Sequence, residues 1–231
     1  MKLLKDQSGN TALIAVLAVA VVVVIGAVAI VVSHKNSMNV TMSSSNTADI
    51  TPSAENLDNS LVTLGLQHMT LTDQAIDATL DGNKDASALD TALYANGNTI
   101  GATVGSVYGS SAQTTFDSVW KLHLDQFVNY AVADSQGNAA GKQAALNAIQ
   151  TGYTVPLAQY LAKANPNLPE STLQTLLSQH VAMTAQIIDD HVQGNYTKEA
   201  SDMNSADQMM TKIFSTLAGA IAKQYPSKFA N

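Results

Sequence analysis

Three histidines recur along this sequence with the same spacing to a Gly-Asn pair. His68, His123 and His180 are each followed by glycine at +14 and asparagine at +15. The histidines are separated by 55 and 57 residues, which indicates a unit that occurs three times. Imidazole nitrogen binds copper and zinc, and helix bundles build metal sites from side chains that face one another at one level. These residues therefore predict a metal site.

The segments that follow each histidine indicate which other side chains share its level. A helix that starts at the histidine covers about 21 Å before the Gly-Asn turn, and the returning helix regains the same height about 28 to 31 residues after the histidine. That level carries polar or sulfur-containing residues, namely Asn96, Asn98, Thr151, Tyr153, Gln208, Met209 and Met210. Thr72 and Thr184 lie one turn after their histidines on the same helix face. We expect one polar layer across an otherwise aliphatic bundle.

Methionine sulfur suits this layer as a further ligand. We expect His68, His123 and His180 to bind the metal together with Met209 or Met210, and with a contribution from Met183 or His191. Imidazole with thioether favours copper, because methionine stabilises the reduced ion, whereas zinc would need a carboxylate or water as fourth ligand. Copper is therefore the cofactor that the sequence favours over zinc.

Two other interpretations stay open at the level of sequence. Each histidine can be a core residue hydrogen-bonded to Thr, Asn or Tyr at its level and repeated by duplication, because the chain has no HxxxH or Glu-x-x-His motif. The protein would then be a non-catalytic structural bundle that binds a protein partner or a small molecule and no metal. The adjacent residues Asp189, Asp190 and His191 are predicted to form a solvated turn.

Apolar residues after the first 56 positions follow helical spacing throughout. Glycine and proline breaks divide the rest into six expected helices, at about 57–80, 85–107, 112–134, 140–164, 170–192 and 197–224. The predicted fold is an all-α, up-and-down bundle of three tandem antiparallel helix pairs. Gly152 and Pro156 predict a kink in the fourth helix, because proline removes one backbone hydrogen bond.

The N-terminal region predicts a membrane anchor. Residues 11–32 contain no charged side chain and are long enough for a hydrocarbon core of about 30 Å. We expect a short cytoplasmic end at 1–10, a transmembrane helix at 11–32, a Ser/Thr/Asn-rich tether at 33–56 and an extracytoplasmic domain at 57–231. A cleaved signal peptide and a pilin-like start are the alternatives. The apolar run is too long for a signal peptide, and the N-terminus lacks the glutamate expected after a prepilin cleavage point.

Composition excludes several classes of function. All 11 basic residues are lysine and the net charge is −7, so nucleic-acid binding is not expected. The chain has no cysteine, which excludes disulfides and thiolate metal sites. No phosphate loop, nucleophile elbow or catalytic triad is recognisable, so we do not expect an enzyme. The expected partner is the membrane, through residues 11–32, and the sequence names no protein partner.

Three segments carry a resemblance to known sequences: ALYANGNTIGATVGSVYG, ANPNLPESTLQTLLSQHVAMT and AIAKQYPSKF. Through them, residues 58 to 229 resemble a family of extracytoplasmic all-helical proteins from Gram-positive and related bacteria, for which no activity is established. The resemblance implies an all-helical fold and a bacterial source. Relatives often carry a histidine near the position of Met209, which would make Met209 a substitute ligand or a lost one.

Overall fold

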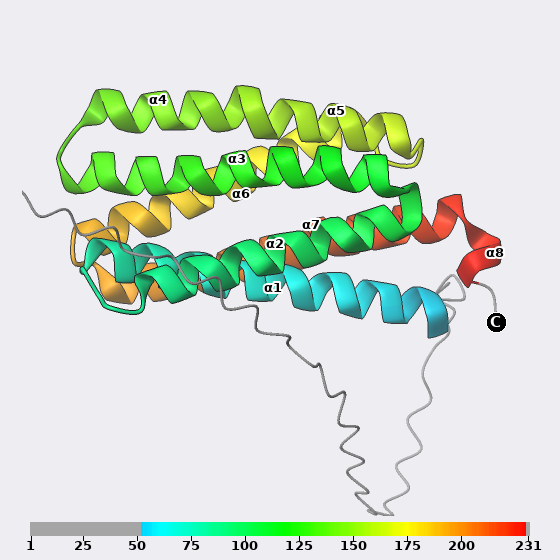
Figure 1. Cartoon of the computed structure of the whole chain (residues 1–231), viewed down its shortest axis with the longest axis horizontal. Helices are drawn as coiled ribbons and strands as arrows, with labels where there is room; N and C mark the ends of the chain where they lie inside the picture. Colours follow the sequence, from blue (N-terminus) through cyan, green and yellow to red (C-terminus); the bar gives the residue numbers. More distant parts are fainter. Residues whose placement is uncertain (1–51, 230–231) are drawn as a thin grey trace, which may run out of the picture. The chain divides into compact units, whose positions relative to one another are not determined.

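The computed structural model describes residues 52–229, and these residues form a helical bundle (Figure 1). The predicted cytoplasmic end, the predicted anchor at 11–32 and the tether up to residue 51 lie outside the described residues. Among residues 52–229 there is no β-strand, which confirms the all-α prediction. No helix in this range is both long and apolar enough to cross a membrane.

The predicted helices are present with small changes at their ends. Their bounds are α1 Pro52–Leu80, α2 Ala86–Tyr108, α3 Ser110–Ser135, α4 Ala139–Ile149, α5 Val155–Ala164, α6 Glu170–Val192, α7 Tyr196–Gln224 and α8 Pro226–Phe229. Helix α1 starts five residues earlier than predicted, because proline is well suited to the first position of a helix. The last part of the predicted tether, from residue 52 to residue 56, is therefore helical.

The Gly-Asn pairs form the turns that the repeat predicted. Gly82, Gly137 and Gly194 have φ angles of 67°, 66° and 72°, a left-handed conformation that glycine adopts without steric cost. Each ends a histidine-bearing helix, and the three turns gather at the left end of the bundle in Figure 1. Helices α1, α3 and α6 consequently run in the same direction.

The histidine-bearing helices form the centre of the bundle. Helices α1, α3 and α6 contact one another, although they are far apart in sequence. Each returning helix covers the groove between two of them: α2 packs on α1 and α3, the α4–α5 pair on α3 and α6, and α7 on α6 and α1. The core is thus an inner triangle of parallel helices inside three antiparallel ones.

The predicted kink in the fourth helix is a π-helical turn, η1, at Gln150–Thr154. The Val155 amide donates to the Gln150 carbonyl, one residue further back than in an α-helix. Pro156 explains the widening, because its ring would collide with the Gly152 carbonyl in a regular α-helix. Gly152 packs closely on Leu122 of α3, so η1 lies directly against an inner helix.

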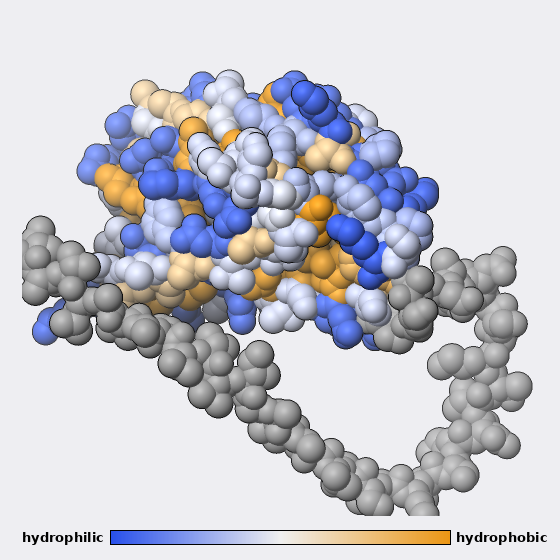
Figure 2. Space-filling model, turned by 45° about the vertical axis from the view of Figure 1, so that its right-hand side comes forward, coloured by the Kyte–Doolittle hydropathy of each residue, from blue (hydrophilic) through white to orange (hydrophobic). Residues whose placement is uncertain are grey.

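The surface is polar where the interior is not. On the face drawn in Figure 2, hydrophilic residues cover most of the bundle between small hydrophobic patches. Among the described residues, Val132 and Tyr196 are the exposed large hydrophobics, whereas His68, His123 and His180 are buried. The polar layer predicted from sequence therefore lies inside the protein, away from solvent.

A first prediction concerns Gly97, where α2 approaches Trp120 of α3. A Cβ atom at position 97 would lie 2.7 Å from Trp120 Cδ1, and Trp120 is held by stacking on Phe116. We expect Gly97→Ala to destabilise the fold by about 1–3 kcal/mol through overpacking. Gly219→Ala is the control, because Gly219 of α7 has nothing within 4 Å and alanine should stabilise that exposed helix by up to about 1 kcal/mol. Urea unfolding followed by circular dichroism measures both, and a stable Gly97→Ala protein would contradict the packing argument.

Candidate metal centre

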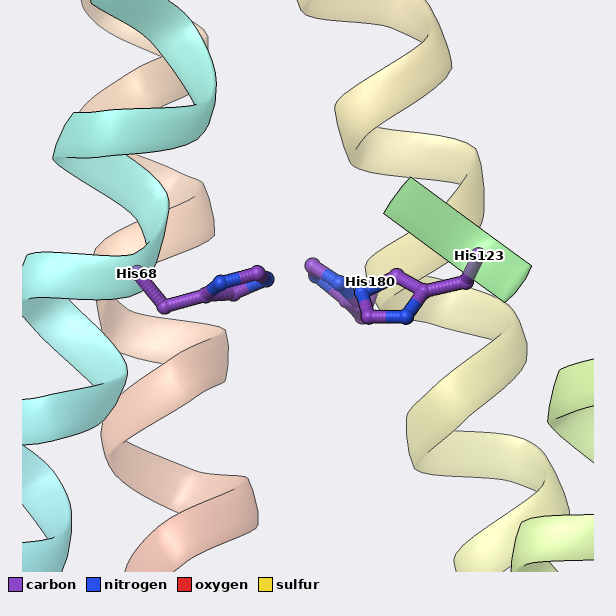
Figure 3. Close-up of side chains that lie close together, drawn as sticks. All are labelled: His68, His123 and His180. Atoms are coloured by element: carbon purple, nitrogen blue, oxygen red, sulfur yellow. The ribbon is translucent and has the colours of Figure 1, made fainter. Parts of the chain in front are cut away.

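The three repeated histidines meet at one point in the centre of the bundle. One nitrogen from each of His68, His123 and His180 lies within 4.8 Å of the others. Figure 3 shows the rings at one level, pointing toward one another from α1, α3 and α6. Nitrogens that share a zinc or copper ion at about 2.0 Å are roughly 3.3 Å apart in tetrahedral geometry, so small side-chain rotations suffice to close the site.

Most imidazole nitrogens of this triad lack a side-chain hydrogen-bond partner. His68 Nδ1 and both ring nitrogens of His180 are buried without any partner, and the His123 ring interacts only with the backbone of Trp120. A buried polar group without a partner costs about 1–3 kcal/mol, and such groups are rare in folded proteins. The bare triad is therefore an unfavourable arrangement that a bound cation would relieve.

The neighbouring Thr and Asn side chains are engaged elsewhere. The hydroxyls of Thr72 and Thr184 donate to the backbone carbonyls of His68 and His180, one turn earlier in their own helices. Asn96 donates to the Leu64 carbonyl and joins α2 to α1. These three side chains therefore direct their hydrogen bonds to the backbone rather than to the imidazoles.

Burial keeps the three imidazoles neutral. Burial, reinforced by the charge of His180, lowers the pKa of His68 to about 3. Burial lowers the pKa of His180 to about 4, and burial together with His68 lowers the pKa of His123 well below its usual value. At neutral pH each ring therefore keeps a free lone pair, which is the form that binds metal ions.

Aromatic side chains enclose the triad. The ring of Tyr153, from the π turn η1, stacks on His123 with centroids 4.2 Å apart. Trp120 packs in the core, with its ring centroid 4.9 Å from that of His68 and 4.7 Å from that of His123. The site is consequently a dry, low-dielectric environment in which water does not compete for the metal.

The predicted methionine ligands are placed differently from one another. Met210 of α7 is buried and lines an apolar cavity together with His180, Trp120 and Tyr153. Met183 and Met209 are half-buried and do not line this cavity. Of the three predicted sulfur ligands, Met210 is thus the one that shares a cavity with His180, and ligation by any of the three stays a prediction.

Some of the polar residues predicted at the level of the triad are buried and others are exposed. Asn96 and Tyr153 are buried and Tyr153 stacks on His123, whereas Asn98, Thr151 and Gln208 are exposed. The layer consists of one inward-facing residue from each outer helix, namely Asn96, Tyr153 and Met210. Helical spacing gives the correct height but not the direction of each side chain.

A second group of potential ligands was missed from the sequence. Asp77, His191 and Glu199 each place one ligand atom within 4.8 Å of the others. The prediction of a solvated turn at Asp189, Asp190 and His191 is wrong, since Asp190 and His191 are buried. A usable signal was present at the end of α1, where Asp73, Asp77 and the following Asp81 recur every fourth residue and share one face.

Comparisons with protein families, with characterised proteins and with solved structures find no match for this chain. The function is therefore argued from the chemistry of the site.

A second prediction follows from the lowered pKa of His180. The unfolded chain takes up a proton near pH 6.5, whereas folded His180 does so only near pH 4, so folding stability is full above pH 6.5 and falls as the pH decreases toward 4. Between pH 7 and pH 5 the metal-free protein should lose about 2 kcal/mol through this residue. Urea unfolding of the parent and of His180→Leu at both pH values tests it, because titrating groups outside the triad cancel in the difference. Equal losses in the two proteins would mean that folded His180 titrates normally.

Proposed function

We propose that the protein binds a copper ion, as Cu(I), through His68, His123 and His180. The observation that carries this proposal is the convergence of three buried imidazoles, most of whose nitrogens have no hydrogen-bond partner. Their neutral state at physiological pH leaves a lone pair on each ring ready to coordinate. Met210, which lines the adjoining cavity, is the proposed fourth ligand.

The charge of the surroundings favours a monovalent ion. The triad consists of neutral donors, and the described side chains that surround it are aromatic or aliphatic, with no carboxylate among its ring contacts. The cost of moving an ion from water into an apolar interior rises with the square of its charge. Cu(I) therefore fits better than Zn(II) or Cu(II), which would need a bound hydroxide or a carboxylate.

We further propose that the bundle works outside the cytoplasm, anchored by residues 11–32. A cysteine-free His/Met site is chemically suited to an oxidising environment, where thiols are unreliable ligands. A copper site that is buried among aromatic side chains suits storage, delivery or sensing of the ion more than catalysis. We propose no enzymatic activity.

The third prediction tests the triad directly. The full-length chain, purified in mild detergent under reducing conditions, should bind one equivalent of Cu(I) in competition with a chromophoric chelator. The combined His68→Gln, His123→Gln and His180→Gln variant should lose this binding, while His191→Gln should retain it as a matched control for loss of a buried histidine. Copper at about 100 times the Kd should raise the free energy of unfolding by about 2.7 kcal/mol.

Where the triple variant does not fold, His180→Gln alone replaces it. X-ray absorption of the copper-loaded parent should then report three nitrogen ligands. Absence of Cu(I) binding by a correctly folded parent would refute the proposal and leave the triad as a duplicated core feature.

The fourth prediction tests the sulfur ligand. Met210→Leu conserves volume but removes the thioether, so it should weaken Cu(I) binding by about tenfold and leave Zn(II) binding unchanged, because sulfur prefers the softer ion. Met203→Leu is the control, since Met203 lines a different cavity, next to Asp73. Chelator competition measures both affinities. Unchanged Cu(I) affinity in Met210→Leu would leave the three imidazoles as the whole site.

A further inference from the structure

A second cluster of ionisable side chains lies near the Gly-Asn end of the bundle, separate from the histidine triad. His191 of α6 has Asp77 Oδ1 of α1 at 3.0 Å and Glu199 Oε1 of α7 at 3.1 Å from its Nδ1 atom. Its Nε2 atom lies 3.3 Å from Asp81 Oδ1. One imidazole is thus surrounded by three carboxylates from two neighbouring helices.

His191 itself, whose pKa is raised by its carboxylate neighbours against the effect of burial, is the cationic group within this cluster. Among the described residues, no lysine forms an ion pair with Asp73, Asp77, Asp81 or Glu199. Lys198, which is next to Glu199 in the sequence, pairs with Asp190 and Asp202 instead. Asp77 belongs to the last turn of α1 and Asp81 directly follows it, where the helix dipole is negative and disfavours carboxylates.

Glu199 supplies an independent indication of a ligand. Its side chain is 92% buried, and Oε2 has no hydrogen-bond partner even though Oε1 contacts His191. Asp73 Oδ1 is likewise buried without a partner. Asp73 and Asp77, but not His191 or Glu199, line a cavity of about 10 Å³ between α1, α6 and α7, a volume close to that of one water-sized guest. The cluster thus has carboxylate oxygens without partners, and a small cavity adjoins Asp73 and Asp77.

Electrostatic crowding is visible in the carboxyl groups themselves. Burial, followed by the charge of Asp73, raises the pKa of Asp77 to about 7. Burial, followed by the charge of Glu199, raises the pKa of Asp73 to about 6. Burial and the neighbouring carboxylates thus disfavour the ionised form of both groups.

We propose that Asp77, His191 and Glu199 form a second metal site, which takes a divalent first-row transition-metal ion, with Asp73 and Asp81 as flanking carboxylates. One imidazole nitrogen with two carboxylate oxygens is a donor set for Zn²⁺ or Mn²⁺. Mg²⁺ and Ca²⁺ prefer oxygen ligands alone, so the imidazole disfavours them. Two ionised carboxylates neutralise the charge of a dication, which the neutral triad cannot do.

The two sites are separate in position and in chemistry. Asp77 follows His68 by nine residues of the same helix, a rise of about 13 Å, and His191 follows His180 by 11 residues, a rise of about 16 Å. No side chain belongs to both sets of ligands. Binding at the second site therefore does not depend on copper binding at the triad.

The fifth prediction tests the second site with Zn²⁺ and Mn²⁺ as probes. The full-length chain in detergent should bind one equivalent of Zn²⁺ that the His68→Gln, His123→Gln, His180→Gln variant retains. Glu199→Gln keeps the shape of the side chain and removes its charge, so it should weaken Zn²⁺ binding by at least about tenfold, since even outer-shell changes at metal sites cost 10- to 100-fold. His191→Gln should have a similar effect, and Mn²⁺ should follow the same order with Mg²⁺ inactive.

Asp202→Asn is the matched control, because Asp202 lies on the same helix and pairs with Lys198 at the surface. Where the triple variant does not fold, the comparison of parent with Glu199→Gln decides, with folding checked by thermal melting. Equal Zn²⁺ affinity in the parent and Glu199→Gln, or Zn²⁺ binding that disappears with the triad alone, would overturn the second site and leave a proton-held cluster. If the parent protein does not bind Cu(I) but does bind Zn²⁺ at this second site, only the copper proposal is refuted.

Discussion

The burial of three neutral imidazoles at one level of an apolar bundle is the constraint on which the rest of the structure depends. Each unpartnered ring nitrogen costs about 1–3 kcal/mol, so the layer persists only because the surrounding helices fix it from every side. Gly97 permits Trp120 to reach the triad, and the π turn at Gln150–Thr154 places Tyr153 on His123. Close packing of aromatic rings, rather than side-chain hydrogen bonds, thus holds the three imidazoles in place.

Two sites of opposite electrostatic character lie along the same inner helices. The triad offers neutral donors in a dry centre, whereas the cluster at Asp77, His191 and Glu199 offers negative charge near the bundle end. A low dielectric magnifies this difference. An ion with uncompensated charge is costly to bury at the triad, whereas the carboxylates at the bundle end attract a cation. The arrangement would separate a monovalent soft ion from a divalent borderline one without any cysteine.

Much of the fold could be predicted from local chemistry. The Gly-Asn turns, the helix between them and the widening at Pro156 follow from left-handed glycine, apolar spacing and the missing proline amide. The predicted level of the polar layer also proved correct for Asn96, Tyr153 and Met210. Helix ends differ by a few residues, as at Pro52, because capping and packing together decide where a helix starts.

The sequence by itself determined three antiparallel helix pairs and the common height of His68, His123 and His180, because spacing along a helix sets height and glycine sets the turn. It did not determine that α1, α3 and α6 contact one another, which of Asn96 and Asn98 faces inward, or that Asp77, His191 and Glu199 meet. Those outcomes depend on which helix faces pack together in three dimensions, and residues more than 100 positions apart leave no local pattern that reports such packing.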